Sequence, residues 1–191
     1  MPAFQATCQT PLQQGLPPAN TRPVRGFSHA DSRFGFLPSR RRRLTARGVQ
    51  PVGPVQPGFA WGSVDGAVEP TTGERCFWAR PSLHADLFQL FVDAFAPAFP
   101  HRLNSLLLDH RGAHTAARRT LPENVRLLFC PPYGPELSPL ERGWRDLKDN
   151  RAWQPCAALE AQQDGLSTLL RAYEADTLQS LTGYPYLVEA M

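Results

Sequence analysis

The 191-residue sequence lacks any apolar run approaching the roughly 20 residues that a membrane-spanning helix needs. It also lacks an apolar stretch near Met1 of the kind that marks a secretory signal. None of its cysteines forms a Cys-x-x-Cys pair, which argues against a zinc ribbon or a disulfide scaffold; they stand at Cys8, Cys76, Cys130 and Cys156. A Gly-rich phosphate loop and a nucleophile elbow are absent too. We therefore expect a cytoplasmic protein with reduced thiols that is neither a P-loop enzyme nor an α/β hydrolase.

Lysine is almost missing, since Lys148 is the only lysine among 20 basic residues. The net charge of +3 is modest but unevenly distributed. Residues 22–47 hold eight arginines and one acid, a net charge of +7, and residues 101–151 hold nine basic and six acidic groups, a net charge of +3. Two basic stretches in an otherwise acidic chain favour a surface that binds a polyanion.

The chain is rich in turn formers, with 20 prolines and 14 glycines, so we expect short secondary-structure elements. Residues 1–21 have no apolar periodicity and are interpreted as a flexible lead-in to one domain over residues 22–191. Three early strands followed by alternating helices and strands predict a mixed α/β sheet with flanking helices. The first expected strand begins at residue 24, and the others cover 58–69, 75–79, 105–108 and 125–130. The first expected helix begins at residue 82, and the others cover 139–150 and 157–173.

Three acids stand out by their predicted positions. Asp109 ends a short apolar strand, Glu141 opens a helix after a proline-rich turn, and Asp31 falls in the first strand. Carboxylates from a sheet and a helix suit hard divalent cations, because Mg²⁺ takes oxygen ligands and keeps several waters. Paired ions of this kind can activate water and stabilise the leaving oxygen in phosphodiester cleavage, while nearby Arg and Lys hold the DNA backbone.

Several motifs around these acids resemble those of one family. They are LDHRGAH at 108–114, LPENV at 121–125 and PPYGPELSPLER at 131–142 with Trp144, together with SRFG at 32–35, TARGV at 45–49, GAVEPTTGE at 66–74 and SLTG at 180–183. The long proline-rich pattern is the most specific of them. The set is similar to the insertion sequence 630 group of mariner-like bacterial transposases, which carry a DDE endonuclease domain.

This resemblance implies an RNase H-like fold with the first Asp on the first strand, the second on the fourth strand and the Glu on a following helix. It implies an enzyme that uses Mg²⁺ or Mn²⁺ to cleave DNA at transposon ends and then joins the freed 3′-hydroxyl to target DNA. The expected partners are double-stranded DNA and a second copy of the chain, in a bacterial cytoplasm near the nucleoid. Asp109 and Glu141 match the second and third acids directly.

The first acid leaves two alternatives open. The family usually reads Asp-Glu-Ser-Arg-Phe-Gly, whereas this chain has Ala30 and Asp31 before Ser32. Either Asp31 is the metal ligand, or Ala30 occupies the ligand position and Asp31 replaces the Glu. A shift of one residue along a strand turns the side chain to the other face, so the two alternatives differ fully in outcome.

The alternative function is that of a DNA-binding transposase remnant whose metal site is incomplete. The helix-turn-helix segments that family members carry before the catalytic domain have no counterpart in residues 1–24. On this basis the sequence is interpreted as a second reading frame, a fragment or a decayed copy.

The remaining candidates have structural explanations as well. Glu141 also completes a capping box with Ser138, and the helix is expected to bury Leu140, Trp144 and Leu147. Asp65 and Asp93 are expected to face solvent. His114 and Tyr133 are possible supports for substrate or metal. The candidate DNA contacts, which a solvated charge run would also explain, are Arg40, Arg41, Arg42, Arg43, Arg142, Arg145 and Lys148.

Overall fold

The computed structural model describes residues 22–35, 44–52, 61–80, 85–109, 120–130, 138–151 and 158–189. The described strands are β1 (Val24–Gly35), β2 (Trp61–Val68), β3 (Arg75–Arg80), β4 (Leu103–Leu108) and β5 (Val125–Phe129). The described helices are α2 (Ala85–Ala98), α4 (Leu140–Arg151), α5 (Leu159–Ala172), α6 (Ala175–Thr182) and α7 (Pro185–Val188). Within these residues, no helix is both long and apolar enough to cross a bilayer.

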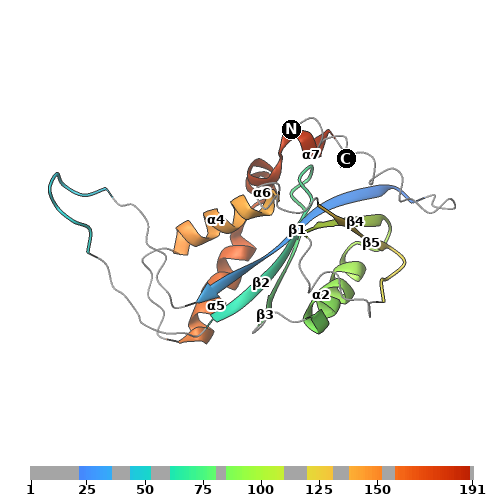
Figure 1. The fold of residues 1–191 in the computed structure, drawn as a ribbon, viewed down its shortest axis with the longest axis horizontal. Coiled ribbons are helices and arrows are strands. Elements are labelled where there is room, and N and C mark those ends of the chain that lie inside the picture. The colour runs from blue at the N-terminus through green and yellow to red at the C-terminus, as the bar shows by residue number, and fades with distance from the viewer. Residues whose placement is uncertain are drawn as a thin grey trace.

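The five strands form one mixed sheet in the order β3-β2-β1-β4-β5. The first three strands pair antiparallel, whereas β4 runs parallel to β1 and β5 runs parallel to β4. This is the sheet that three early strands and a later alternation of helix and strand predict. The helices cover both faces, with α2 on one side and α4 and α5 on the other (Figure 1).

Helix α2 covers one face with a stripe of phenylalanines. Phe88, Phe91 and Phe95 are fully buried, and their rings pack against Phe27 and His29 of β1. The i, i+3, i+4, i+7 spacing of apolar residues along the sequence predicts this stripe, because those positions share one side of a helix. We call this side of the sheet the α2 face.

Helices α4 and α5 cover the opposite side, which we call the α4 face. The predicted stripe of α4 is confirmed, since Leu140, Trp144 and Leu147 are buried. They pack with Ala30 and Phe34 of β1 in a second hydrophobic cluster. Because successive strand residues alternate between the two faces, the even-numbered residues of β1 lie beneath α4 and the odd-numbered ones beneath α2.

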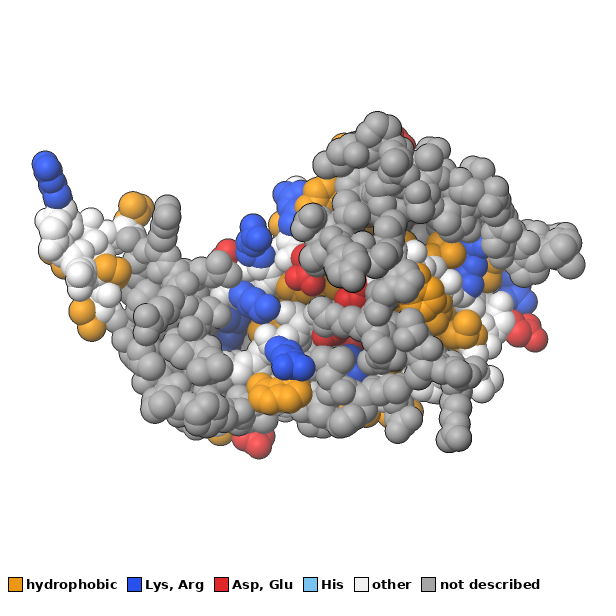
Figure 2. Space-filling model, viewed as in Figure 1, with side chains coloured by type: hydrophobic (Ala, Val, Ile, Leu, Met, Phe, Trp, Pro, Cys, Tyr) orange, Lys and Arg blue, Asp and Glu red, His pale blue; other side chains and the backbone are white. Residues whose placement is uncertain are grey.

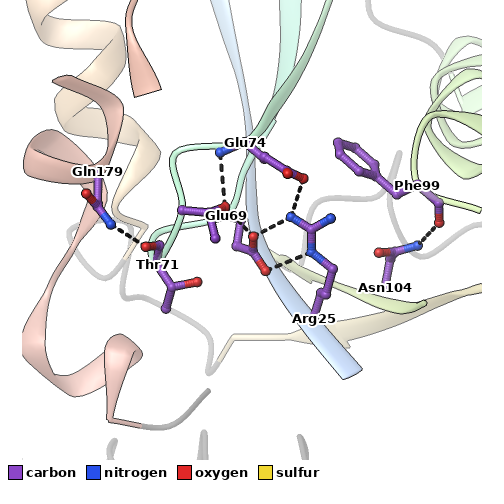
Figure 3. Close-up of polar contacts among 8 residues, drawn as sticks. Arg25, Glu69, Thr71, Glu74, Phe99, Asn104 and Gln179 are labelled. Atoms are coloured by element: carbon purple, nitrogen blue, oxygen red, sulfur yellow. Dashed lines mark hydrogen bonds and ion pairs between the residues drawn. The ribbon is translucent and has the colours of Figure 1, made fainter. Parts of the chain in front are cut away.

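The turn between β2 and β3 is held by an ionic cluster. Arg25 of β1 donates from Nε to Glu69 Oε1 at 2.9 Å, and its Nη2 bonds both Glu69 and Glu74 (Figure 3). Thr72 also donates to Glu69. Burial raises the pKa of the Glu69 carboxyl, but the hydrogen bonds from Arg25 and Thr72 outweigh it and leave the pKa below its ordinary value. The predicted hairpin turn is therefore clamped to the central strand.

Helix α6 docks on the same turn. The Gln179 side chain donates to the carbonyl of Thr71 (Figure 3). Gly73 has a φ of +71°, and a Cβ there would lie 2.1 Å from the carbonyl oxygen of Ala175. Only glycine allows that close approach of the turn to the helix. The sequence motifs at 66–74 and 180–183 thus belong to segments that meet in space.

Two features differ from the sequence-based expectations. Helices α6 and α7 were not predicted, because each is too short for apolar periodicity to be visible. The expectation that Asp65 faces solvent is wrong, since it is fully buried and forms an ion pair with Arg80. The sequence around Asp65 does not indicate that it will pair with Arg80, which lies 15 positions later.

Candidate functional site

The three candidate acids fall on the expected elements. Asp31 lies in β1, Asp109 directly follows β4, and Glu141 lies in the first turn of α4. Asp109 and Glu141 are both half-buried. This order of first strand, fourth strand and following helix is the one that the family resemblance implies.

The register of β1 shows where Asp31 points. Asp31 pairs directly with Asp65 across the antiparallel ladder, and paired residues present their side chains on the same face. Asp65 lies on the α2 face, where its carboxylate contacts the His29 imidazole at 3.5 Å. Asp31 is therefore on the α2 face, opposite the face that carries α4 and Glu141.

Ala30 occupies the corresponding place on the α4 face. It packs in the cluster that contains Trp144 and Leu140. The parallel register of β1 and β4 runs from Val24 opposite Leu103 to Ser28 opposite Leu107. Continued by two residues, this register sets Ala30 beside Asp109. The strand position next to Asp109 and beneath α4 thus carries a methyl group instead of a carboxylate.

A pocket of about 410 Å³ lies along the exposed side of α4. Its lining includes one acid, three cations and a tyrosine from beyond α6, namely Glu141, Arg142, Arg145, Lys148 and Tyr184. Figure 2 shows blue Lys and Arg side chains beside red carboxylates on the part of this surface where Figure 1 places α4. Three of the residues expected to contact DNA therefore share one pocket with Glu141.

The capping box expected at the start of α4 is not formed by Ser138. Its Oγ finds no hydrogen-bond partner among the described residues. The backbone supplies the first contact of the helix instead, because the Glu141 N–H donates to the Ser138 carbonyl at 3.2 Å. Hydroxyl capping of the helix does not explain why a serine stands at this position.

The donor chemistry fits a hard divalent cation in part. No group of three or more His, Cys, Asp and Glu side chains within the described ranges is arranged to hold a metal ion. Asp109 and Glu141 offer two carboxylates, and Mg²⁺ is usually bound by one or two carboxylates together with waters and substrate phosphates. The two side chains are therefore of the chemical type that Mg²⁺ binds.

Several candidates lie outside the described residues. These are Arg40, Arg41, Arg42 and Arg43 in the basic run, and His114 and Tyr133 near the acids. Sequence reasoning missed Tyr184, which lines the pocket although it lies 43 positions after Glu141. Its only sequence signal is that it directly follows the motif at 180–183.

Residues 31–160 match the family described as DDE superfamily endonuclease. The chain belongs to this family. This match covers both Asp109 and Glu141 and begins at Asp31. An uncharacterized protein of Sinorhizobium fredii, y4pE/y4sA, is 30% identical over 91 residues, which are 47% of this chain and 67% of that protein.

The structure of this DDE superfamily member is similar to solved structures of the Mos1 transposase. The Mos1 strand transfer complex matches with a TM-score of 0.67 and 16% identity, over 97% of this chain and 58% of that chain. The Mos1 mariner paired end complex with Mn matches with a TM-score of 0.64 and 14% identity, over 97% and 59%. The chain spans less than two thirds of the Mos1 chains. These likenesses confirm the expected RNase H-like α/β fold.

Proposed function

We propose that residues 22–191 form a transposase catalytic domain of the insertion sequence 630 group, which cleaves and joins DNA strands at transposon ends. The observation that carries the proposal is the pocket on α4, which sets Glu141 among the three cations Arg142, Arg145 and Lys148. Membership of the DDE superfamily supports it. The Mos1 structures of similar fold are complexes named for strand transfer and paired ends, which supports transposon DNA as the substrate and paired copies of the chain as the active form.

Different residues of the chain bind the DNA backbone and the metal ion. Arg142, Arg145 and Lys148 neutralise backbone phosphates and set the DNA along α4. Asp109 and Glu141 are the residues that would hold a divalent cation, because Mg²⁺ takes carboxylate oxygens as ligands. A Mg²⁺ or Mn²⁺ ion bound there supplies water activation and charge stabilisation at the leaving oxygen. We leave Asp31 out of this proposed set, because it pairs with Asp65, whose carboxylate contacts His29 on the α2 face.

Nicking of terminal-repeat DNA tests the proposal. The purified chain is incubated with a labelled duplex carrying the transposon end, with and without Mg²⁺ or Mn²⁺. Loss of a metal-holding carboxylate in Asp109→Asn or Glu141→Gln should lower the nicking rate at least a hundredfold, about 2.7 kcal/mol of barrier. Asp31→Asn is the matched control and should retain the wild-type rate. Equal nicking by wild type and Asp109→Asn would contradict the proposal.

The second candidate is a domain of the same fold that binds DNA without cutting it. The specific observation in its favour is that the register of β1 and β4, continued by two residues, sets Ala30 and not an acid beside Asp109. The same nicking assay separates the two. If the wild type binds DNA without nicking it and Ala30→Asp gains metal-dependent nicking, the chain is an incomplete copy whose missing group is this one carboxylate.

A further inference from the structure

Two residues that line the pocket on α4 carry buried polar atoms without a hydrogen-bond partner in the described part of the protein. Trp144 is 2% exposed and its Nε1 finds no partner there, and neither does the buried Oγ of Ser138. Both residues line the pocket. An unsatisfied buried donor costs free energy, so each of these groups needs a structural explanation. With Arg142 and Arg145 also lining the pocket, the matching acceptor is an anionic oxygen.

Tyr184 contributes to this pocket through Arg142. The guanidinium carbon of Arg142 lies 5.2 Å from the centre of the Tyr184 ring. An arginine over an aromatic face is held by the ring, while the N–H groups at its edges remain available for bidentate contact with a phosphate. The ring therefore reduces the freedom of an exposed cation that would otherwise move over several rotamers.

The backbone of Tyr184 is held by hydrogen bonds at the end of α6. Gly183 ends α6 with its N–H bonded to the Gln179 carbonyl at 2.7 Å, and the Tyr184 N–H bonds the Thr182 carbonyl at 2.8 Å. The same Gln179 side chain binds the β2–β3 turn at Thr71 (Figure 3). Tyr184 is thus connected through α6 to the turn between β2 and β3, and its ring lies beside Arg142 of α4.

We propose that the pocket on α4 is a subsite for a backbone phosphate of the bound DNA strand, and that Tyr184 is a positioning residue that orients Arg142 toward that phosphate. The identity of the ligand as DNA rests on the proposed function. The role of Tyr184 and the assignment of one phosphate to Arg142 go beyond it. The pocket volume of about 410 Å³ suits one nucleotide-sized group.

The experiment measures binding of a fluorescein-labelled blunt duplex to the full chain by anisotropy, over a series of KCl concentrations and without divalent metal. Arg142→Gln should weaken binding about tenfold and reduce the slope of log K against log[salt] by about one, as expected for one phosphate contact. Arg33→Gln is the matched control, because Arg33 also stacks on an aromatic ring, at 4.7 Å from Trp61, but is outside the pocket lining. It should leave the slope unchanged.

A double-mutant cycle tests whether Tyr184 acts through Arg142. Tyr184→Leu should weaken binding several-fold in the wild-type background and have no effect in Arg142→Gln, whereas Tyr184→Phe, which keeps the ring, should bind like wild type. Thermal denaturation of each variant identifies a folding defect, and Tyr184→Phe remains informative if Tyr184→Leu is unstable. Additive effects of the two substitutions, weak binding by Tyr184→Phe, or an unchanged slope in Arg142→Gln would each overturn the proposal.

Failure of this inference is distinct from failure of the proposed function. The binding assay contains no metal and does not depend on cleavage. A protein that nicks DNA in an Asp109-dependent way but binds equally well with and without Arg142 would retain the proposed activity and lose the subsite. A protein that does not nick but shows the expected salt slopes would retain the subsite.

Discussion

At the scale of single residues, the buried pair of Asp65 and Arg80 is the most consequential polar contact on the α2 face. Their side chains are 0% and 1% exposed, and the His29 ring lies beside Asp65. Taking one partner away from such a pair leaves the other charge buried without compensation. The pair therefore makes the middle strands of the sheet intolerant of neutral substitution.

We expect Asp65→Asn to lower the free energy of unfolding by about 3–5 kcal/mol, because Arg80 would remain buried and uncompensated. Urea denaturation followed by circular dichroism measures the change. Asp93→Asn is the control, since Asp93 is an exposed acid on α2, and it should change the value by no more than about 0.5 kcal/mol. Similar losses in both variants would show that Asp65 contributes no more than an ordinary surface carboxylate.

At the scale of elements, the β2–β3 turn depends on the ionisation of Glu69. Its pKa lies below the ordinary value of 4.5, because the hydrogen bonds from Arg25 and Thr72 outweigh the effect of burial. A lowered folded-state pKa means that the stabilisation is complete above the unfolded value and is lost as pH falls through the folded value. The clamp on the turn should therefore fail in acid.

We expect the free energy of unfolding to fall as the pH is lowered from about 5 toward 3, and this slope to be smaller in Glu69→Gln. Equilibrium urea unfolding at closely spaced pH values gives the slope. Glu174→Gln is a suitable control, because Glu174 is an exposed carboxylate whose side chain makes no capping hydrogen bond to α6. If the slope is the same in wild type and Glu69→Gln, the carboxylate is not linked to folding in the way described.

Elements also show what sequence patterns predict and what they miss. The stripe of α4 and the phenylalanines of α2 follow from periodicity, because one helix face meets one sheet face. The place of Tyr184 in the pocket does not follow from periodicity. It depends on a long-range contact, in which Gln179 binds a turn 108 positions away in the sequence. Likewise, the sequence leaves Asp31 and Ala30 as alternatives, and only the pairing with Asp65 assigns each to a face.

At the scale of the whole molecule, two separate hydrophobic clusters lie on opposite faces of one sheet. Strand β1 contributes Phe27 to one cluster and Phe34 to the other. Because the same strands support both clusters, we expect them to be lost together. The predicted single domain over residues 22–191 would then unfold in one transition.

Phe91→Ala tests this cooperativity. Truncating a fully buried ring should cost about 3–5 kcal/mol, and the urea midpoints seen by tryptophan fluorescence and by circular dichroism should shift together. Leu90→Ala on the same helix is the control, because Leu90 is 51% exposed. Separate transitions for the two probes would indicate that the faces unfold independently.

The alternation of β1 also limits how this lineage could change its chemistry. A one-residue insertion or deletion near position 30 would turn over one half of the strand and take either Phe27 or Phe34 out of its layer. An Ala30→Asp substitution, in contrast, leaves the register of the strand and both layers in place. Selection for or against a full set of acids would therefore act at one codon.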